Sequence, residues 1–134
     1  MFHIIIQARM GSKRLPEKSL MSYKKLSPLY ILCKSLKKVR NVSKIIVATT
    51  KHKRDDKIVN LCKNLNISYF RGSNKNVLFR YYCAANKFKS KEIIRLTGDN
   101  PFVDIRTLKQ MINLKKNSNY NYVADTYPPP STYP

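Results

Sequence analysis

The chain has 134 residues, a length that favours one domain with a modest hydrophobic core. Its 27 lysine and arginine residues against 7 aspartate and glutamate residues give a formal charge of +20, which indicates a polyanionic partner unless the lysines merely solvate helix surfaces. Three scattered cysteines argue against a disulfide framework or a cysteine metal site, and no apolar run approaches the roughly 20 residues of a membrane span, so we expect a soluble cytoplasmic protein.

Apolar strand-like segments alternate with helical patterns along the chain. Strands are predicted over residues 2–8, 44–50, 66–70 and 91–96, and a fifth is predicted to begin within residues 121–124. Helices are predicted after Ser27, from Asp55 and Asp56, from Val77 and after Asp104, with Ser27 and Asp104 as N-caps. This alternation predicts a mainly parallel sheet with helices on both faces, which binds its ligands beyond the carboxyl ends of the strands.

The loop after the first predicted strand is rich in cations. Arg9, Lys13, Arg14 and Lys18 follow the apolar run, with Gly11 among them. Arginine offers a planar fork and lysine a mobile charge to phosphate oxygens, while glycine lets backbone amides approach them. The spacing fits neither a Walker A loop nor GxGxxG. The loop therefore indicates a phosphoryl ligand, with a solvated basic connection as the alternative.

A second unusual loop follows the strand predicted at residues 91–96. Asp99 comes directly after Gly98, at the edge of the sheet where ligands are expected. Magnesium prefers carboxylate and phosphate oxygens together with water. Asp99 is therefore a candidate metal ligand, and an ordinary turn is the alternative.

The order of several segments resembles one enzyme family. The segments are QARMGSKRLPEKSL, VATT, the Asp55-Asp56 pair, FRGS, VLFRYY and RLTGDNPFVD. Together they are similar to cytidylyltransferases that make CMP-activated sugars, such as the acylneuraminate and 3-deoxy-manno-octulosonate enzymes, and most of all to a spore-coat polysaccharide biosynthesis branch. The resemblance implies a three-layer α/β/α, Rossmann-like nucleotidyltransferase fold (GT-A-like) whose C-terminal part is missing here.

The resemblance also implies roles for particular residues. Arg14, Lys18 and Asp99 would be catalytic, with Asp99 holding Mg²⁺. The residues implied to bind the nucleotide are Ala8, Arg9, Gly11, Ser12, Arg14, Lys18, Thr49, Arg80 and Thr97. Arg80 has a plain alternative as a surface arginine of a helix.

The implied reaction is attack by a sugar hydroxyl on the α-phosphorus of CTP, which gives a CMP-sugar and pyrophosphate for surface polysaccharide synthesis. Residues 1–134 would form a truncated nucleotide-binding domain that ends in a Pro/Tyr-rich tail over residues 125–134. The expected partners are CTP and a sugar or sugar-acid acceptor, with a homodimer or a complementing C-terminal segment, and no membrane. Two alternatives stay open: a basic nucleic-acid-binding module, and a nonfunctional remnant of the transferase.

Overall fold

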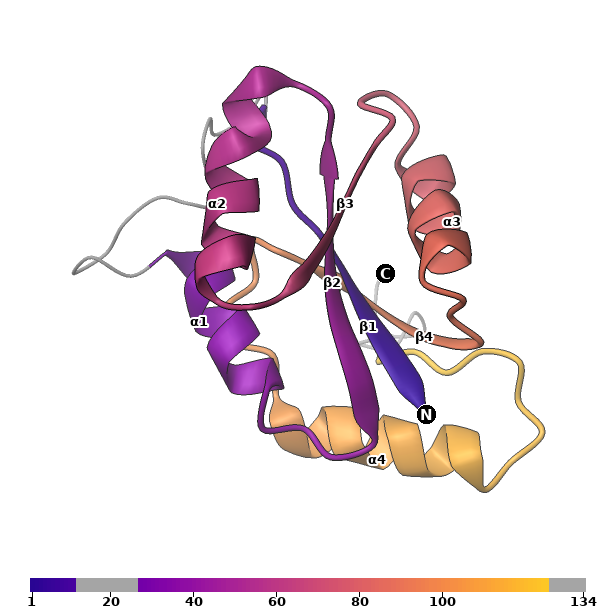
Figure 1. Cartoon of the computed structure of the whole chain (residues 1–134). Coiled ribbons are helices and arrows are strands. Elements are labelled where there is room, and N and C mark those ends of the chain that lie inside the picture. Colours follow the sequence, from indigo (N-terminus) through magenta and orange to yellow (C-terminus); the bar gives the residue numbers. More distant parts are fainter. Residues whose placement is uncertain (12–26, 126–134) are drawn as a thin grey trace, which may run out of the picture. The chain divides into compact units, whose positions relative to one another are not determined.

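Four parallel strands form one sheet in the computed structural model, which describes residues 1–11 and 27–125 (Figure 1). They are β1 (Phe2–Gln7), β2 (Val42–Thr50), β3 (Ser68–Gly72) and β4 (Glu92–Thr97), and their order across the sheet is β3-β2-β1-β4. Since all pairings are parallel, the carboxyl ends of the strands meet at one edge. The parallel α/β sheet predicted from the sequence is confirmed.

The chain divides into two compact units, Met1–Phe102 and Val103–Pro134. The first holds the sheet together with α1 (Pro28–Leu36), the short helix η1 (Lys53–Asp55), α2 (Asp56–Asn64) and α3 (Val77–Lys87). The second holds α4 (Ile105–Lys116), whose buried residues Leu108 and Ile112 lie one turn apart.

Helices cover both faces of the sheet within the first unit. Figure 1 shows α1 and α2 on one side of the strands and α3 on the other. Ile5, Ile46 and Ala48 pack with Tyr81 and Ala84 of α3 in one apolar cluster. Burial on both faces explains why β1 is almost continuously apolar, because a central parallel strand has no solvent side. The predicted three-layer arrangement is therefore present.

Strand β4 lies at an edge of the sheet among the described residues. Its side chains alternate between half-buried and exposed, and Ile93, Arg95 and Thr97 are the exposed ones. Because successive side chains point to opposite faces of the sheet, one face of β4 is more covered than the other, whereas both faces of β1 are covered.

Two of the predicted helix starts, after Ser27 and after Asp104, are confirmed by their caps. Ser27 Oγ accepts a hydrogen bond from the Tyr30 amide at 3.2 Å, and Asp104 Oδ1 accepts one from the Arg106 amide at 2.8 Å. Cys33 and Cys62 are buried in α1 and α2, as expected of small apolar side chains. None of the helices in the described ranges is both long enough and apolar enough to cross a bilayer.

Two strand predictions need correction. Residues 121–124 form no strand in the described part of the chain, and Tyr122 is 81% exposed there. The third strand begins at Ser68 rather than at Asn66. Asn66 has a positive φ of 51°, and the Ile67 amide donates to Cys62 O, so both residues belong to the end of α2.

Candidate functional site

The chain leaves β1 between the ends of its two neighbours. The Ala8 amide donates to Ala48 O of β2 at 3.3 Å, and the Gly98 amide donates to Gln7 O at 2.7 Å from the β4 side. Ala8 is buried, and Arg9 is half-buried. Residues 9–11 therefore start from a fixed position at the carboxyl edge of the sheet, where parallel sheets bind their ligands.

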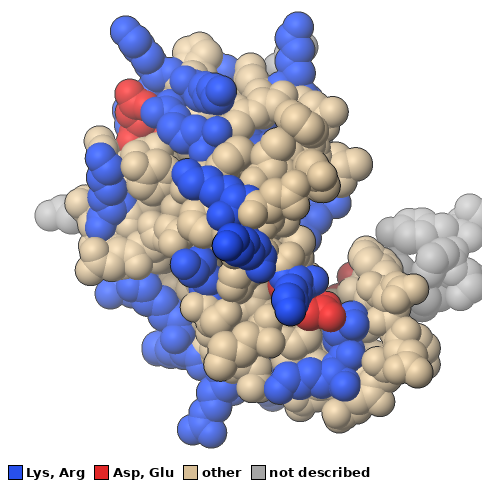
Figure 2. Space-filling model, turned by 45° about the vertical axis from the view of Figure 1, so that its right-hand side comes forward, with Lys and Arg blue, Asp and Glu red and all other residues tan. Residues whose placement is uncertain are grey.

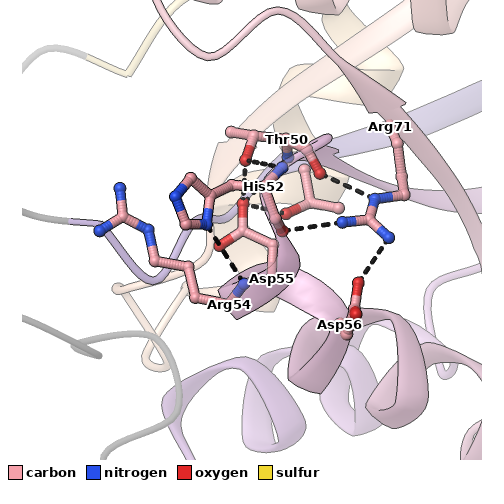
Figure 3. Close-up of polar contacts among 7 residues, drawn as sticks. Thr50, His52, Arg54, Asp55, Asp56 and Arg71 are labelled. Carbon is pink, nitrogen blue, oxygen red and sulfur yellow. Dashed lines mark hydrogen bonds and ion pairs between the residues drawn. The ribbon is translucent and has the colours of Figure 1, made fainter.

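A buried carboxylate joins this loop to β2. Asp55 is 1% exposed, and its Oδ1 accepts a hydrogen bond from the Met10 amide at 2.9 Å. Its Oδ2 accepts bonds from Thr49 Oγ1 and the Thr50 amide, each at 3.1 Å, and from Thr50 Oγ1 (Figure 3). One side chain thus holds both the loop after β1 and the end of β2.

Arg71 makes the corresponding connection from β3. Its Nε donates to Thr50 O at 2.9 Å and its Nη2 to His52 O at 2.8 Å, while Nη1 pairs with Asp56 Oδ1 at 2.6 Å (Figure 3). These contacts fix the turn between β2 and η1. The ends of β1, β2 and β3 are consequently tied together by side chains as well as by the strand ladders.

Arg80 of α3 is fully buried, so its alternative as a surface arginine is excluded. Its Nη1 donates to Ser73 O, but Nε and Nη2 have no hydrogen-bond partner within the described ranges. Burial lowers the pKa of Arg80, and the positive charge of Arg9 lowers it further. An arginine keeps its proton in proteins, so two unpaired donors of a buried cation lie near a second cation. This arrangement favours the binding of an anion beside Arg80 and Arg9.

The loop after β4 lies beside the loop after β1. Gly98 is buried, and a Cβ at this position would lie 2.9 Å from Ala8 Cβ and 3.1 Å from Gln7 O, so only glycine fits without a shift. Thr97 is exposed at the end of β4, and Asp99 is half-buried just beyond it. Within residues 1–11 and 27–125, no three His, Cys, Asp or Glu side chains cluster in a way that could hold a metal ion.

Most of the predicted site residues that the structure describes lie at this one edge. They are Ala8, Arg9, Gly11, Thr49, Thr97 and Asp99, with Arg80 reaching the end of β3 from α3. The guanidinium of Arg54 lies against Gly11, where a Cβ would collide with it. Ser12, Arg14 and Lys18 lie outside the described residues.

Two residues of the site, Asp55 and Arg71, were not assigned to it from the sequence. The sequence predicts Asp55 only as an acid at the start of a helix and a member of the Asp55-Asp56 motif, and Arg71 only as part of the motif FRGS. The signal for Asp55 is its spacing from Thr49 and Thr50, whose hydroxyls need a buried acceptor at the end of an apolar strand. That signal depends on knowing that the turn folds back over the strand.

Positive charge is distributed widely over the surface. Figure 2 shows lysine and arginine side chains across the visible face, with acidic side chains at few places. No single compact patch stands out in this view. The net charge of +20 therefore says less about the ligand than the few cations positioned at the sheet edge.

Comparison with known proteins gives one consistent result. The profile of a family described as cytidylyltransferase matches residues 3–129. An uncharacterized protein of Methanocaldococcus jannaschii is 43% identical over 120 residues, which make up 90% of this chain and 49% of that protein. The spore coat polysaccharide biosynthesis protein SpsF of Bacillus subtilis is 38% identical over 127 residues, with 90% and 53% covered.

A solved cytidylyltransferase of Leptospira borgpetersenii superposes with a TM-score of 0.83 at 36% identity, covering 88% of this chain and 50% of that one. The likeness therefore extends over most of this chain, in its fold as well as its sequence. The chain spans about half the length of the relatives it matches.

Proposed function

The chain belongs to the cytidylyltransferase family, and from that premise we propose that it binds CTP at the carboxyl edge of its sheet. The observation that carries the proposal is the loop of residues 9–11, held in place by Asp55 and placed near a buried arginine with unpaired donors. The Leptospira cytidylyltransferase, which shares the fold at 36% identity, supports the same assignment.

The proposed reaction transfers a cytidylyl group to a sugar or sugar-acid hydroxyl. The hydroxyl oxygen attacks the α-phosphorus of CTP, the bond to the β-phosphate oxygen breaks, and pyrophosphate leaves with its electron pair while the hydroxyl proton passes to solvent. Such a transfer needs positioning and charge stabilisation rather than a protein nucleophile. The name of the Bacillus relative supports a CMP-sugar product destined for polysaccharide synthesis.

Each site residue has a proposed part in holding the nucleotide. The backbone at Ala8 and Arg9 meets the cytosine, and the amides at Gly11 and Ser12 meet the phosphates. Arg14 and Lys18 neutralise the leaving pyrophosphate, while Arg80 and Thr97 border the nucleotide. The hydroxyl of Thr49 already donates to buried Asp55, so we assign Thr49 to support of the loop.

Magnesium is the proposed cofactor, and the residues of the site fit it if CTP supplies the other ligands. The described residues offer no cluster of three ligating side chains at the site, and Asp99 is a half-buried carboxylate on the loop beside Ala8. Mg²⁺ commonly uses one or two carboxylates together with substrate phosphates and water. Asp99 would therefore hold the ion jointly with CTP, and the ion would supply charge to the phosphates during transfer.

The relatives are about twice as long as this chain, so the proposal for the acceptor sugar involves residues outside it. We propose that binding of the acceptor sugar needs a complementing C-terminal segment or a second copy of the chain. Among the described residues no strand pairs with the outer edge of β4, where Ile93 is 44% exposed, and we propose that such a segment extends the sheet there.

The test is a calorimetric titration of CTP into folded protein, with ATP as the competing nucleotide and with Mg²⁺ present or chelated. We expect Mg²⁺-dependent preference for CTP. Arg9→Gln should weaken binding under both conditions, and Asp99→Asn should remove most of the Mg²⁺-dependent part. Arg106→Gln, on the exposed side of α4, is the matched control that should bind like the wild type.

The same calorimetric titration, repeated with a DNA duplex in place of CTP, tests the two alternatives: a nucleic-acid-binding module and a nonfunctional remnant. Binding of a DNA duplex with a steep dependence on salt, and no binding of CTP, would favour the nucleic-acid-binding module. A folded protein that binds neither ligand would indicate a remnant without function. Equal loss in Asp99→Asn with and without Mg²⁺ would contradict the metal role of Asp99.

A further inference from the structure

We propose that Asp55 is a positioning residue that sets nucleotide affinity by fixing the loop of residues 9–11 against the end of β2. The inference rests on the proposed function, since it assumes that this loop holds the nucleotide. It goes further by assigning the placement of the loop to one carboxylate that never touches the ligand.

The first step is the set of bonds that Asp55 makes. Both of its oxygens are occupied: Oδ1 by the Met10 amide, and Oδ2 by Thr49 Oγ1 and by the amide and hydroxyl of Thr50. The bond to Met10 joins residues that are 45 positions apart in the sequence. Met10 lies between Arg9 and Gly11, so any shift of this bond moves the proposed contacts with the cytosine and with the phosphates.

The second step excludes the ordinary reason for an aspartate at this position. Asp55 is the N-cap residue of α2, where a carboxylate commonly accepts a bond from the first turn of the helix. Its side chain makes no such bond. The carboxylate therefore does not cap α2 and binds the loop and the strand instead.

The third step concerns burial. A carboxylate that is 1% exposed is unfavourable unless its oxygens are satisfied, and here four donors satisfy them. The negative charge also raises the pKa of Arg80, in opposition to burial and Arg9. Asp55 thus supports the buried cation while its own oxygens face protein donors.

The variant that tests this is Asp55→Asn, which keeps the shape but replaces one acceptor oxygen with an NH₂ group. Binding of CTP with Mg²⁺ should weaken about tenfold or more, as expected when hydrogen bonds to a buried charged group are lost. Exchange of the Met10 amide, measured by NMR without ligand, should accelerate in the same variant. Thr50→Val, a milder change that removes one donor to the same carboxylate, should give a smaller loss and should fold even if Asp55→Asn does not.

Two controls separate positioning from general destabilisation. Asp104→Asn makes the same chemical change at the cap of α4, where asparagine is an equally good cap, and should leave CTP affinity unchanged. Cys62→Ala removes buried volume in α2, and should lower the melting temperature without lowering CTP affinity.

The outcomes distinguish this inference from the proposed function. If the wild type binds CTP and Asp55→Asn binds within twofold of it with the Met10 amide still protected, the positioning role is overturned and the proposed function stands. If Cys62→Ala weakens CTP binding as much as an Asp55 or Thr50 variant of equal melting temperature, positioning is overturned in favour of stability alone. If the folded wild type binds no CTP, both proposals are overturned.

Discussion

Replacing Gly98 with alanine should damage both the stability of the protein and its proposed metal loop. A Cβ at this position would lie 2.9 Å from Ala8 Cβ, 3.1 Å from Gln7 O and 3.2 Å from Leu29 Cδ1. Carbon atoms pack best at about 3.5–4.0 Å, so the first contact is too short by about 0.6–1 Å. Two of the three neighbours, Gln7 and Ala8, are the last residue of β1 and the buried residue after it, which cannot move easily, so the turn that carries Gly98 must shift.

The magnitude follows from the cost of overpacking, which is about 1–3 kcal/mol in a well-packed interior. For a chain of this length that corresponds to a fall in melting temperature of roughly 3–15 °C. The shift also lengthens the bond from the Gly98 amide to Gln7 O, now 2.7 Å, and displaces the adjacent Asp99. Binding of CTP should therefore weaken more with Mg²⁺ present than with Mg²⁺ chelated.

Thermal unfolding followed by circular dichroism, together with the CTP titration, measures both effects. The double variant Ala8→Gly/Gly98→Ala removes the shortest of the three contacts. Its loss in free energy of unfolding should therefore be smaller than the sum of the losses in the two single variants. A Gly98→Ala protein that melts within 1 °C of the wild type and binds CTP equally would refute this reasoning. So would a double variant with no recovery.

Three further predictions concern stability and reactivity. Lys89 has a positive φ of 50°, so Lys89→Gly should stabilise the protein by roughly 0.5–1 kcal/mol in urea unfolding, and Asn66→Gly, at a residue type that tolerates this backbone, should gain less. Burial, followed by the charge of Lys44, lowers the pKa of His3 below its usual 6.5. The unfolded chain therefore takes up a proton at a higher pH than the folded chain, so the free energy of unfolding should fall as the pH drops below about 6.5. His3→Gln should make the free energy of unfolding less dependent on pH in this range. Burial raises the pKa of Cys33 and Cys62 to about 12, so a thiol reagent should label half-buried Cys83 first, and rapid labelling of the other two in folded protein would contradict their burial.

The elements of the fold could be predicted because their signals are local. Pro28 after Ser27 predicts a helix start from two adjacent residues, and Asp104 does so through its own side chain. The apolar runs of β1 and β2 predict buried strands without knowledge of their neighbours. A prediction failed where the outcome depends on pairing, as at residues 121–124, which have strand-like residues but pair with no strand among the described residues.

The candidate site could be predicted only in part for the same reason. Arg9, Gly11 and Asp99 follow strands directly, so the parallel sheet places them at one edge. The burial of Arg80 and the bonds of Asp55 depend on how α3 and η1 fold back over that edge. No periodicity in the sequence reports such contacts, and Arg80, for which a surface position was the alternative, is buried.

Asp55 and Arg80 are the charged side chains that are fully buried in the part of the chain the structure describes, and both lie at the carboxyl edge of the sheet. Burying a charge is unfavourable, and apolar replacements often serve stability as well or better. A requirement for stability alone would not concentrate both buried charges where three strands end. A requirement to hold a loop and attract an anion would do so. The surface lysines carry most of the +20 and could be exchanged with little effect on this edge, so the position of these two charges is a stronger indication of a phosphorylated ligand than the net charge.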